Sequence, residues 1–366
     1  AIAASLGIST GEAGLLSTVT LALSAVGGVG AGILIDRIGR VRTLLLTVIT
    51  YAVFTVLCGF APTFESLLVL RGLQGLGFGG EWAAGAILVA EYCSPRYRGQ
   101  TVGFIQSSWA LGWALSVVVA TTVFSLATPR LAWRLLFRTG ALPALLVVYL
   151  RSRVSDAPIV AQHGEHDQHR GSIFGRRWGW TTFCAALLAT GVQGGYYTLV
   201  TWIPAYLKTQ RHLTVVGTGA YLVVLIVGAF VGYIIGSYLT DLLGRKWTFV
   251  LFAALSAVLI LAYTHLPAGA STTVLVLGFP LGLCTSAIFS GFGSFLAELY
   301  PTAQRGTGLG FTYNTGRGLG ALFPTLVGFL AESWGLGGAM VIGALAYGLA
   351  VLALLGLPET RGRELT

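Results

Sequence analysis

The sequence predicts an all-α membrane protein with eleven transmembrane spans. Of the 366 residues, 55% are apolar and only 10% are charged, and the apolar residues lie in long runs. A soluble domain carries about 25% charged residues, so this chain lacks the polar surface that a water-soluble globule needs. At about 20 residues per crossing, its length suits ten to twelve membrane helices. The composition therefore excludes a soluble enzyme, a nucleic-acid-binding protein and a disordered scaffold.

Each expected span is an apolar run that ends at Gly, Pro or a charged cluster. Small residues such as the 51 glycines let membrane helices approach closely. In chain order, the expected spans are 12–35, 41–60, 65–92, 99–127, 131–150, 179–207, 216–240, 246–264, 270–299, 304–331 and 336–357.

The connections between these spans alternate in charge. One set carries 15 of the 22 Lys and Arg residues, whereas the other carries four, namely Arg130, Arg134, Lys208 and Arg211. Because basic loops stay on the cytoplasmic side, we expect a multi-pass protein of the cytoplasmic membrane with its C-terminus inside. The net charge of +9 then reflects topology and does not indicate a nucleic-acid partner.

This orientation places the beginning of the chain on the outer face. Residues 1–8, followed by cap signals at Ser9, Thr10 and Glu12, are typical of the outer end of an earlier helix. We therefore expect that the first helix is missing from this chain and that the intact protein has twelve spans.

The chain also repeats itself. The Asp-x-x-Gly-Arg loop at 36–40 recurs at 241–245, and Glu91, Arg98 and Gly99 recur 207 residues later. We therefore expect two homologous halves of six spans, 1–150 without its first helix and 179–366, joined by a cytoplasmic linker at 151–178. The four cysteines are scattered, and the histidines at 163–169 are typical of a solvated linker, so we expect neither a metal site nor a cofactor.

Two six-helix halves with an Asp-Arg-x-Gly-Arg loop resemble the major facilitator superfamily of secondary transporters over essentially the whole chain. Residues 71–75 are similar to the Arg-x-x-Gln-Gly signature that is common in its proton-coupled members. Residues 77–82 and the ending at 358–362 resemble metabolite:proton symporters for carboxylates, including the sialate, lactate and aromatic-acid branches. The resemblance implies the major facilitator fold and transport by alternating access.

The charges at the helix ends are predicted to form the gate of such a transporter. Asp36 is expected to accept hydrogen bonds from a helix terminus or a basic group when the cytoplasmic side is closed. Glu91 is expected near Arg98 on the same, cytoplasmic face. A salt bridge that is present in only one state would set the equilibrium between states. The alternative is that these charges only cap helices and fix topology. The candidate gating residues are Asp36, Arg37, Arg40, Glu91, Arg98, Asp241, Arg245, Glu298 and Arg305.

Among the charges within the expected spans, three clearly qualify as charges of the membrane interior, namely Arg71, Glu81 and Arg317. A charge at mid-membrane costs about 2.5–3.5 kcal/mol, so it is usually retained for a function. None of the three recurs in the other half. Glu81, with Arg71 on the same helical stripe, is the candidate for proton coupling, although a carboxylate permanently paired with Arg71 is the alternative. In the aromatic-acid branch, acidic residues of the first helix could take this role.

Arg317 is the candidate anchor for an anionic substrate, because its planar guanidinium binds a carboxylate through two hydrogen bonds. Neighbouring glycines are expected to clear space around it, and a structural pair with Glu81 is the alternative. Arg138 is expected to lie near the outer interface. The other candidate substrate contacts are Tyr313, Asn314, Gln106, Trp109, Gln193, Tyr196 and Tyr197.

The sequence thus predicts proton-coupled uptake of a small organic anion such as a monocarboxylate, a sialate or an aromatic acid. The partners are this anion, a proton and the lipid bilayer, and we expect a monomer. A sugar or polyol porter is the alternative within transport, and a truncated membrane protein without transport is the alternative outside it. The spans contain no Ser/His/Asp or metal constellation, so we do not expect an enzyme.

Overall fold

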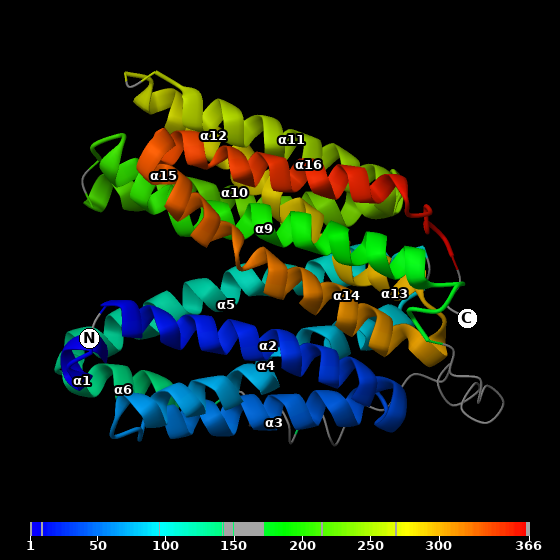
Figure 1. Ribbon diagram of the computed structural model, residues 1–366, viewed down its shortest axis with the longest axis horizontal. Coiled ribbons are helices and arrows are strands. Elements are labelled where there is room, and N and C mark those ends of the chain that lie inside the picture. Colours follow the sequence, from blue (N-terminus) through cyan, green and yellow to red (C-terminus); the bar gives the residue numbers. More distant parts are fainter. Residues whose placement is uncertain are drawn as a thin grey trace. The chain divides into compact units, whose positions relative to one another are not determined.

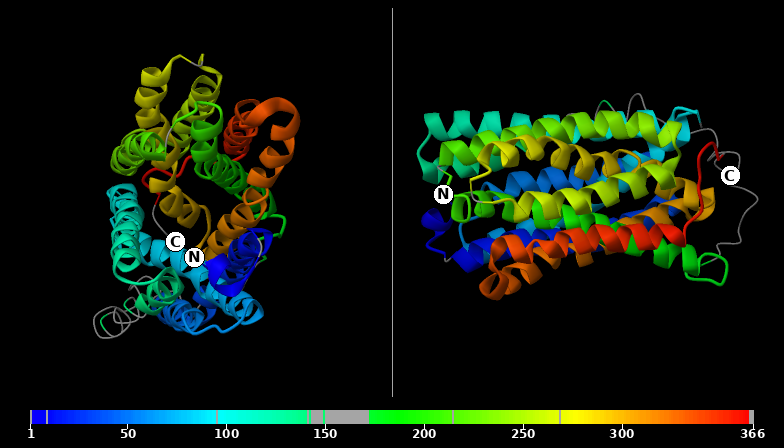
Figure 2. Two further views of the ribbon diagram at one scale, coloured as in Figure 1. Left: turned by 90° about the vertical axis from the view of Figure 1, so that its left-hand side faces the viewer. Right: turned by 90° about the horizontal axis from the view of Figure 1, so that it is seen from above.

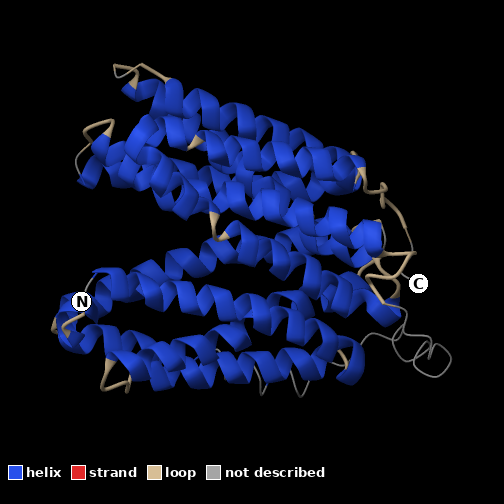
Figure 3. Ribbon diagram, in the orientation of Figure 1, coloured by secondary structure: helices blue, strands red, loops and turns tan. Residues whose placement is uncertain are grey.

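The computed structural model describes residues 2–8, 10–94, 96–140, 142, 149, 172–213, 215–267 and 269–363. Their regular elements are all helical, with no strand among them (Figure 3). This confirms the predicted all-α class. Seven described helical stretches are long and apolar enough to cross a membrane, while the count of eleven spans stays a prediction. The predicted linker lies outside the described residues up to position 171.

The chain forms two compact units. Unit 1 contains residues Ala1–Tyr92, Leu111–Gly171 and Tyr300–Asn314. Unit 2 contains Cys93–Ala110, Ser172–Leu299 and Thr315–Thr366. Two of the boundaries fall inside helices α5 and α14, and each unit holds residues from both predicted halves.

In unit 1, α2 and α3 each pack along α4 (Figures 1 and 2). Glycines bring α2 and α4 into backbone contact, because a Cβ on Gly79 would collide with the carbonyl oxygen of Ser24, and one on Gly75 with that of Thr20. The helices that lie wholly in this unit are α1 (Ile2–Leu6), α2 (Thr10–Ile38), α3 (Arg40–Cys58), α4 (Phe64–Tyr92), α6 (Pro129–Thr139) and the short 3₁₀ helix η1 (Thr302–Gln304), and parts of α5 (Arg98–Leu126) and α14 (Arg305–Gly320) join them.

Gly79 therefore provides a test of this packing. Gly79→Ala is expected to lower the free energy of unfolding by about 1–3 kcal/mol, because the added methyl group forces α2 and α4 apart. Gly85→Ala, on the same helix with open space around its Cβ position, is the matched control and should be neutral or slightly stabilising. Thermal unfolding in detergent measures both, and equal midpoints for the two variants would contradict the close approach.

Unit 2 also contains a closely packed helix pair with glycines at its contact, and this pair is the repeat counterpart of α2 and α4. Helix α10 packs along α12, and Cβ atoms on Gly228, Gly232 and Gly236 would collide with carbonyl oxygens of α12. The helices that lie wholly in this unit are α9 (Gly179–Thr209), α10 (Val215–Leu242), α11 (Arg245–His265), α12 (Ser271–Ser290), α13 (Phe292–Leu299), α15 (Phe323–Ala339) and α16 (Val341–Leu355).

Among the predicted spans that the structure describes throughout, two are interrupted. The 270–299 run breaks at Gly291 between α12 and α13, and the 304–331 run breaks after Gly320 between α14 and α15. Pro324 has no N–H to bond the Gly320 carbonyl, which accounts for the second break. Gly335 interrupts α15 with a φ of 69°, which glycine adopts without the strain that a side chain would bring.

Candidate functional site

The polar contacts of unit 1 gather where α2, α3, α4 and the beginning of α14 meet. Asp36, in the last turn of α2, accepts hydrogen bonds from the backbone N–H groups of Gly306 and Thr307 at 2.9 and 2.7 Å. The Thr307 hydroxyl donates a third at 2.7 Å. The first N–H groups of a helix have no partner within it, so the carboxylate caps α14 and complements its dipole.

Glu91 holds two arginines in the same place, and we call Asp36, Arg40, Glu91 and Arg305 the Glu91 cluster. Arg40 donates to both Glu91 oxygens, each at 3.0 Å, while Arg305 donates to one of them at 2.6 Å. The Glu91 and Arg305 side chains are fully buried. Arg40 also donates to the Thr302 carbonyl oxygen at 3.2 Å. One carboxylate thus ties α4 to both α3 and α14.

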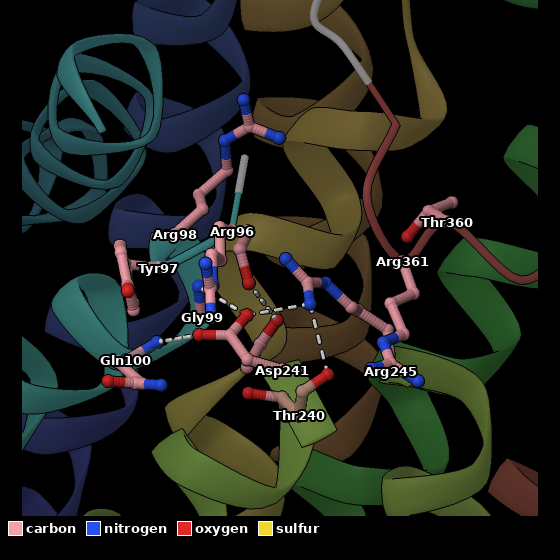
Figure 4. A network of polar contacts seen from close by, with 12 residues as sticks. Arg96, Tyr97, Arg98, Gly99, Gln100, Thr240, Asp241, Arg245, Thr360 and Arg361 are labelled. Carbon is pink, nitrogen blue, oxygen red and sulfur yellow. Dashed lines mark hydrogen bonds and ion pairs between the residues drawn. The ribbon is translucent and has the colours of Figure 1, made fainter. Parts of the chain in front are cut away.

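Unit 2 repeats this arrangement with the recurring residues. Asp241, at the end of α10, accepts hydrogen bonds from the backbone N–H groups of Gly99 and Gln100 at 3.0 and 2.7 Å, at the beginning of α5. Arg245 pairs with the same carboxylate at 2.7 Å. Figure 4 shows Asp241 between the Gly99–Gln100 backbone and the Arg245 guanidinium.

Glu298 takes the part of Glu91, and we call Arg98, Asp241, Arg245 and Glu298 the Glu298 cluster. Its buried carboxylate accepts from Arg98 at 2.9 Å and from Arg245 at 3.0 and 3.1 Å. The Thr360 hydroxyl adds a fourth hydrogen bond at 2.6 Å. Glu91 was expected near Arg98 on the same face. The structure pairs Glu91 with Arg305 and Arg98 with Glu298, so each of these arginines binds the glutamate of the other repeat.

The ending of the chain belongs to this second cluster, which sequence reasoning missed. Glu359 accepts hydrogen bonds from the backbone N–H groups of Arg245 and Lys246 at 2.9 and 3.0 Å and so caps α11. Arg98 donates to the carbonyl oxygen of Arg363 at 3.0 Å. The sequence signal for this contact is the 358–362 motif. Arg37, also a gating candidate, is exposed and makes no ion pair with a described residue.

The membrane-interior charges of α4 lie in unit 1. Arg71 donates to the Gln74 side chain at 2.8 Å, and its guanidinium lies 5.6 Å from the Phe137 ring centroid. Glu81 is partly buried and makes no ion pair or hydrogen bond with the described residues. The alternative in which Arg71 pairs permanently with Glu81 is therefore not seen.

Next to Glu81, Trp82 stacks on Tyr313 with ring centroids 3.6 Å apart and an angle of 17° between the rings. Asn314 is fully buried and donates to the Gly310 carbonyl oxygen at 2.9 Å, while its own side-chain oxygen has no described partner. A side chain on Gly28 would collide with this amide. The stack and the amide place α14 tightly against α4 and α2.

Arg317 lies in the last turn of α14, within unit 2, and is 6% exposed. Two of the glycines near it, Gly316 and Gly320, face a neighbouring helix and not open space. A Cβ on Gly316 would collide with Ala189, and one on Gly320 would lie 2.9 Å from the Gly194 nitrogen. These glycines instead admit the backbone of α9, because two helices can approach this closely only where side chains are absent.

The remaining substrate candidates also lie in unit 2. Tyr197 donates to the buried Gln193 side chain at 3.2 Å, and Tyr196 packs edge-on against Phe289. On α5, Gln106 is partly buried and Trp109 is 52% exposed. The structure thus groups Gln193, Tyr196 and Tyr197 on α9, and their contact with a substrate remains a prediction.

The sequence model of the protein family named Major Facilitator Superfamily matches residues 1–239 and 218–366 of this chain. The chain belongs to the major facilitator superfamily. It is 40% identical to a probable 4-methylmuconolactone transporter of Cupriavidus pinatubonensis, over 97% of this chain and 84% of the relative. It is 30% identical to the cis,cis-muconate transport protein of Acinetobacter baylyi, over 98% and 88%.

Among solved structures, the proton:xylose symporter XylE of the same superfamily has a TM-score of 0.80 and 19% identity to this chain. The match covers 99% of this chain and 90% of XylE, so it shows the major facilitator fold. This chain is therefore a multi-pass membrane transporter of this superfamily and not an enzyme. This confirms the predicted fold, the predicted family and the predicted role in transport.

Proposed function

We propose that this major facilitator protein is a proton-coupled symporter for a small organic anion. The protein is proposed to act as a monomer and to carry the anion into the cell. The observation that carries the proposal is the pair of unshared interior charges, Glu81 on α4 and Arg317 on α14. Structural charges such as Glu91 and Glu298 recur in both halves, whereas these two do not. A cation for the substrate and a carboxylate for the proton are the minimum that anion:proton symport requires.

The relatives support an anionic substrate. One is the cis,cis-muconate transport protein, and another is the niacin transporter NiaP of Acinetobacter baylyi, which is 27% identical over 87% of this chain and 79% of the relative. Muconate and niacin are both carboxylates near neutral pH. Arg317 suits this chemistry, because a guanidinium keeps its charge and offers two parallel N–H donors to a carboxylate. A neutral sugar would give Arg317 no charge to meet.

The two clusters are proposed as the gate on the cytoplasmic side. By the positive-inside rule, we assign both clusters and the C-terminus to that side. The linker at 151–178, which joins the proposed halves 1–150 and 179–366, is assigned to the same side. Opening towards the cytoplasm would release α14 from Asp36 and Glu91, and α5 from Asp241 and Glu298. Alternating access then requires that the binding free energy of substrate and proton compensates for the free energy lost with these contacts.

Glu81→Gln separates proton coupling from substrate movement. A glutamine cannot take up or release the proton, so gradient-driven accumulation should fall at least about tenfold while exchange of labelled for unlabelled substrate continues. Proteoliposomes assayed in both modes measure the two activities. Glu65→Gln, at an exposed position on the same helix, is the matched control and should change neither. Unimpaired accumulation by Glu81→Gln would contradict the coupling role.

The substrate class is tested by competition. Labelled cis,cis-muconate is offered to proteoliposomes that contain the full chain, together with an excess of unlabelled benzoate, nicotinate, lactate or xylose. Carboxylates should inhibit uptake, whereas xylose should not. Inhibition by xylose alone would favour the sugar porter, and absence of uptake of every compound would contradict transport of small organic anions.

A further inference from the structure

Helix α6 carries three arginines at a spacing of four residues, Arg130, Arg134 and Arg138. It packs on α3, beside the 59–63 connection that leads into α4, so it lies at the end of unit 1 away from the Glu91 cluster. At the repeat offset of 207, Arg134 and Arg138 correspond to Val341 and Leu345. These arginines also depart from the charge bias of the chain, because they occur where basic residues are scarce.

Aromatic rings and one carbonyl hold the two inner arginines in place. The Arg134 guanidinium lies 4.2 Å from the Trp133 ring centroid, and that of Arg138 lies 4.1 Å from the Phe60 centroid. Arg134 donates once, to the Ala61 carbonyl oxygen at 3.0 Å. A Cβ on Gly59 would lie 2.9 Å from Arg138 Cγ, so the stem of Arg138 is fixed against the end of α3. Cation–π contact orients each guanidinium and does not use its N–H donors.

Several donors in this place have no acceptor. Arg138 makes no hydrogen bond or ion pair with the described residues, and its buried Nε is unpartnered. Arg134 Nη1 and Trp133 Nε1 are likewise buried without an acceptor. Glu65, in the first turn of α4, is exposed and pairs with neither arginine. Since an unsatisfied buried donor is costly, these groups point to an anion as their partner.

Arg211 of unit 2, which also lies in a connection with few basic residues, has a different set of hydrogen-bond partners. Its Nη1, Nη2 and Nε donate to the Pro267 carbonyl, the Leu266 carbonyl and the Tyr206 hydroxyl at 2.7, 2.8 and 2.8 Å. All three nitrogens are thus engaged in fixing the 266–267 connection. In contrast, Arg134 makes one such hydrogen bond, and Arg138 makes none with the described residues.

We propose that Arg134 and Arg138 form a carboxylate-binding subsite on unit 1, separate from Arg317, that captures the organic anion. Spaced by four residues on one helix, the two guanidinium groups lie on one face and can share a single carboxylate. The identity of the ligand rests on the proposed function. An anionic lipid headgroup offers similar oxyanion chemistry, so the test separates the two sources.

The experiment titrates the full chain in lipid-free detergent with cis,cis-muconate and follows the heat of binding. Arg317→Gln removes the central anchor and should leave one residual site. Adding Arg138→Gln should weaken this residual binding at least about tenfold, as expected for the loss of a charge-assisted contact. Arg130→Gln, which removes an exposed charge from the same helix, is the matched control and should leave it unchanged. Arg138→Lys, in which the charge remains, covers the case of a poorly folded Gln variant and should weaken binding to a smaller extent.

Equal residual affinity in the Arg138 and Arg130 variants would overturn the proposal, as would absence of residual binding after Arg317→Gln. Loss of muconate binding on addition of phosphatidylglycerol would identify a lipid headgroup site and would also overturn it. Failure of the proposed function appears separately, because proteoliposomes would then show no muconate uptake while the titration still detects binding at α6.

Discussion

Glu298→Gln is expected to reduce transport at least about 100-fold and to lower the free energy of unfolding by about 3–5 kcal/mol. The buried carboxylate balances Arg98 and Arg245 and also accepts a hydrogen bond from Thr360. A neutral amide leaves two buried guanidinium groups with only Asp241 to balance them, and its NH₂ group meets donors. Initial uptake rates in proteoliposomes and thermal unfolding in detergent measure the two effects.

Glu332→Gln is the matched control, since Glu332 lies exposed on α15 in the same unit. It should leave both the uptake rate and the unfolding midpoint unchanged. Combining Glu298→Gln with Arg98→Leu should recover part of the lost stability, because one unpaired charge is removed with its partner. A Glu298→Gln protein as stable and active as Glu332→Gln would show that the cluster contributes neither to the fold nor to the gate.

Arg317→Lys is expected to weaken substrate affinity at least about 100-fold. Lysine keeps the charge but loses the planar pair of donors that a carboxylate engages. Titration of the purified protein with cis,cis-muconate measures the affinity, with Lys208→Gln, an exposed charge in the same unit, as the control. Affinity retained in Arg317→Lys would exclude the guanidinium fork as the anchor.

The sequence predicted the helices well because the membrane imposes simple rules on their length and composition. Runs of apolar residues gave the elements, and the repeated loop at 36–40 and 241–245 located both clusters. The interruptions at Gly291 and after Gly320 were not predicted, since hydropathy does not register where a helix bends. They depend on one glycine and on Pro324, whose effects are local and independent of the apolar content of the run.

The sequence named the cluster residues but not all their partners. Asp36 was expected at a helix terminus or a basic group, and it binds the beginning of α14. Asp241, its counterpart in the repeat, binds the beginning of α5 and Arg245. The partners of Glu91, Arg40 and Arg305, were not predicted, because the pairing depends on which helices pack together, and spacing along the chain does not contain this information. The same limit applies to Glu359, whose bonds to α11 form only when the end of the chain folds back.

The interior residues show a further limit. Glycines around Arg317 suggested open space, whereas two of them admit α9. A glycine in a membrane helix suits either a ligand or a neighbouring helix, and one sequence does not distinguish the two. The stack of Trp82 on Tyr313 was likewise missed, although Tyr313 was singled out as a candidate.

The most direct test of anion:proton symport is the accumulation of labelled cis,cis-muconate in proteoliposomes with and without an inward proton gradient, at a membrane potential clamped to zero. Under proton symport, the gradient should drive the internal concentration above the external one, and a protonophore should abolish the difference. Accumulation that is the same with and without the gradient would contradict proton coupling, even if muconate still equilibrates across the membrane.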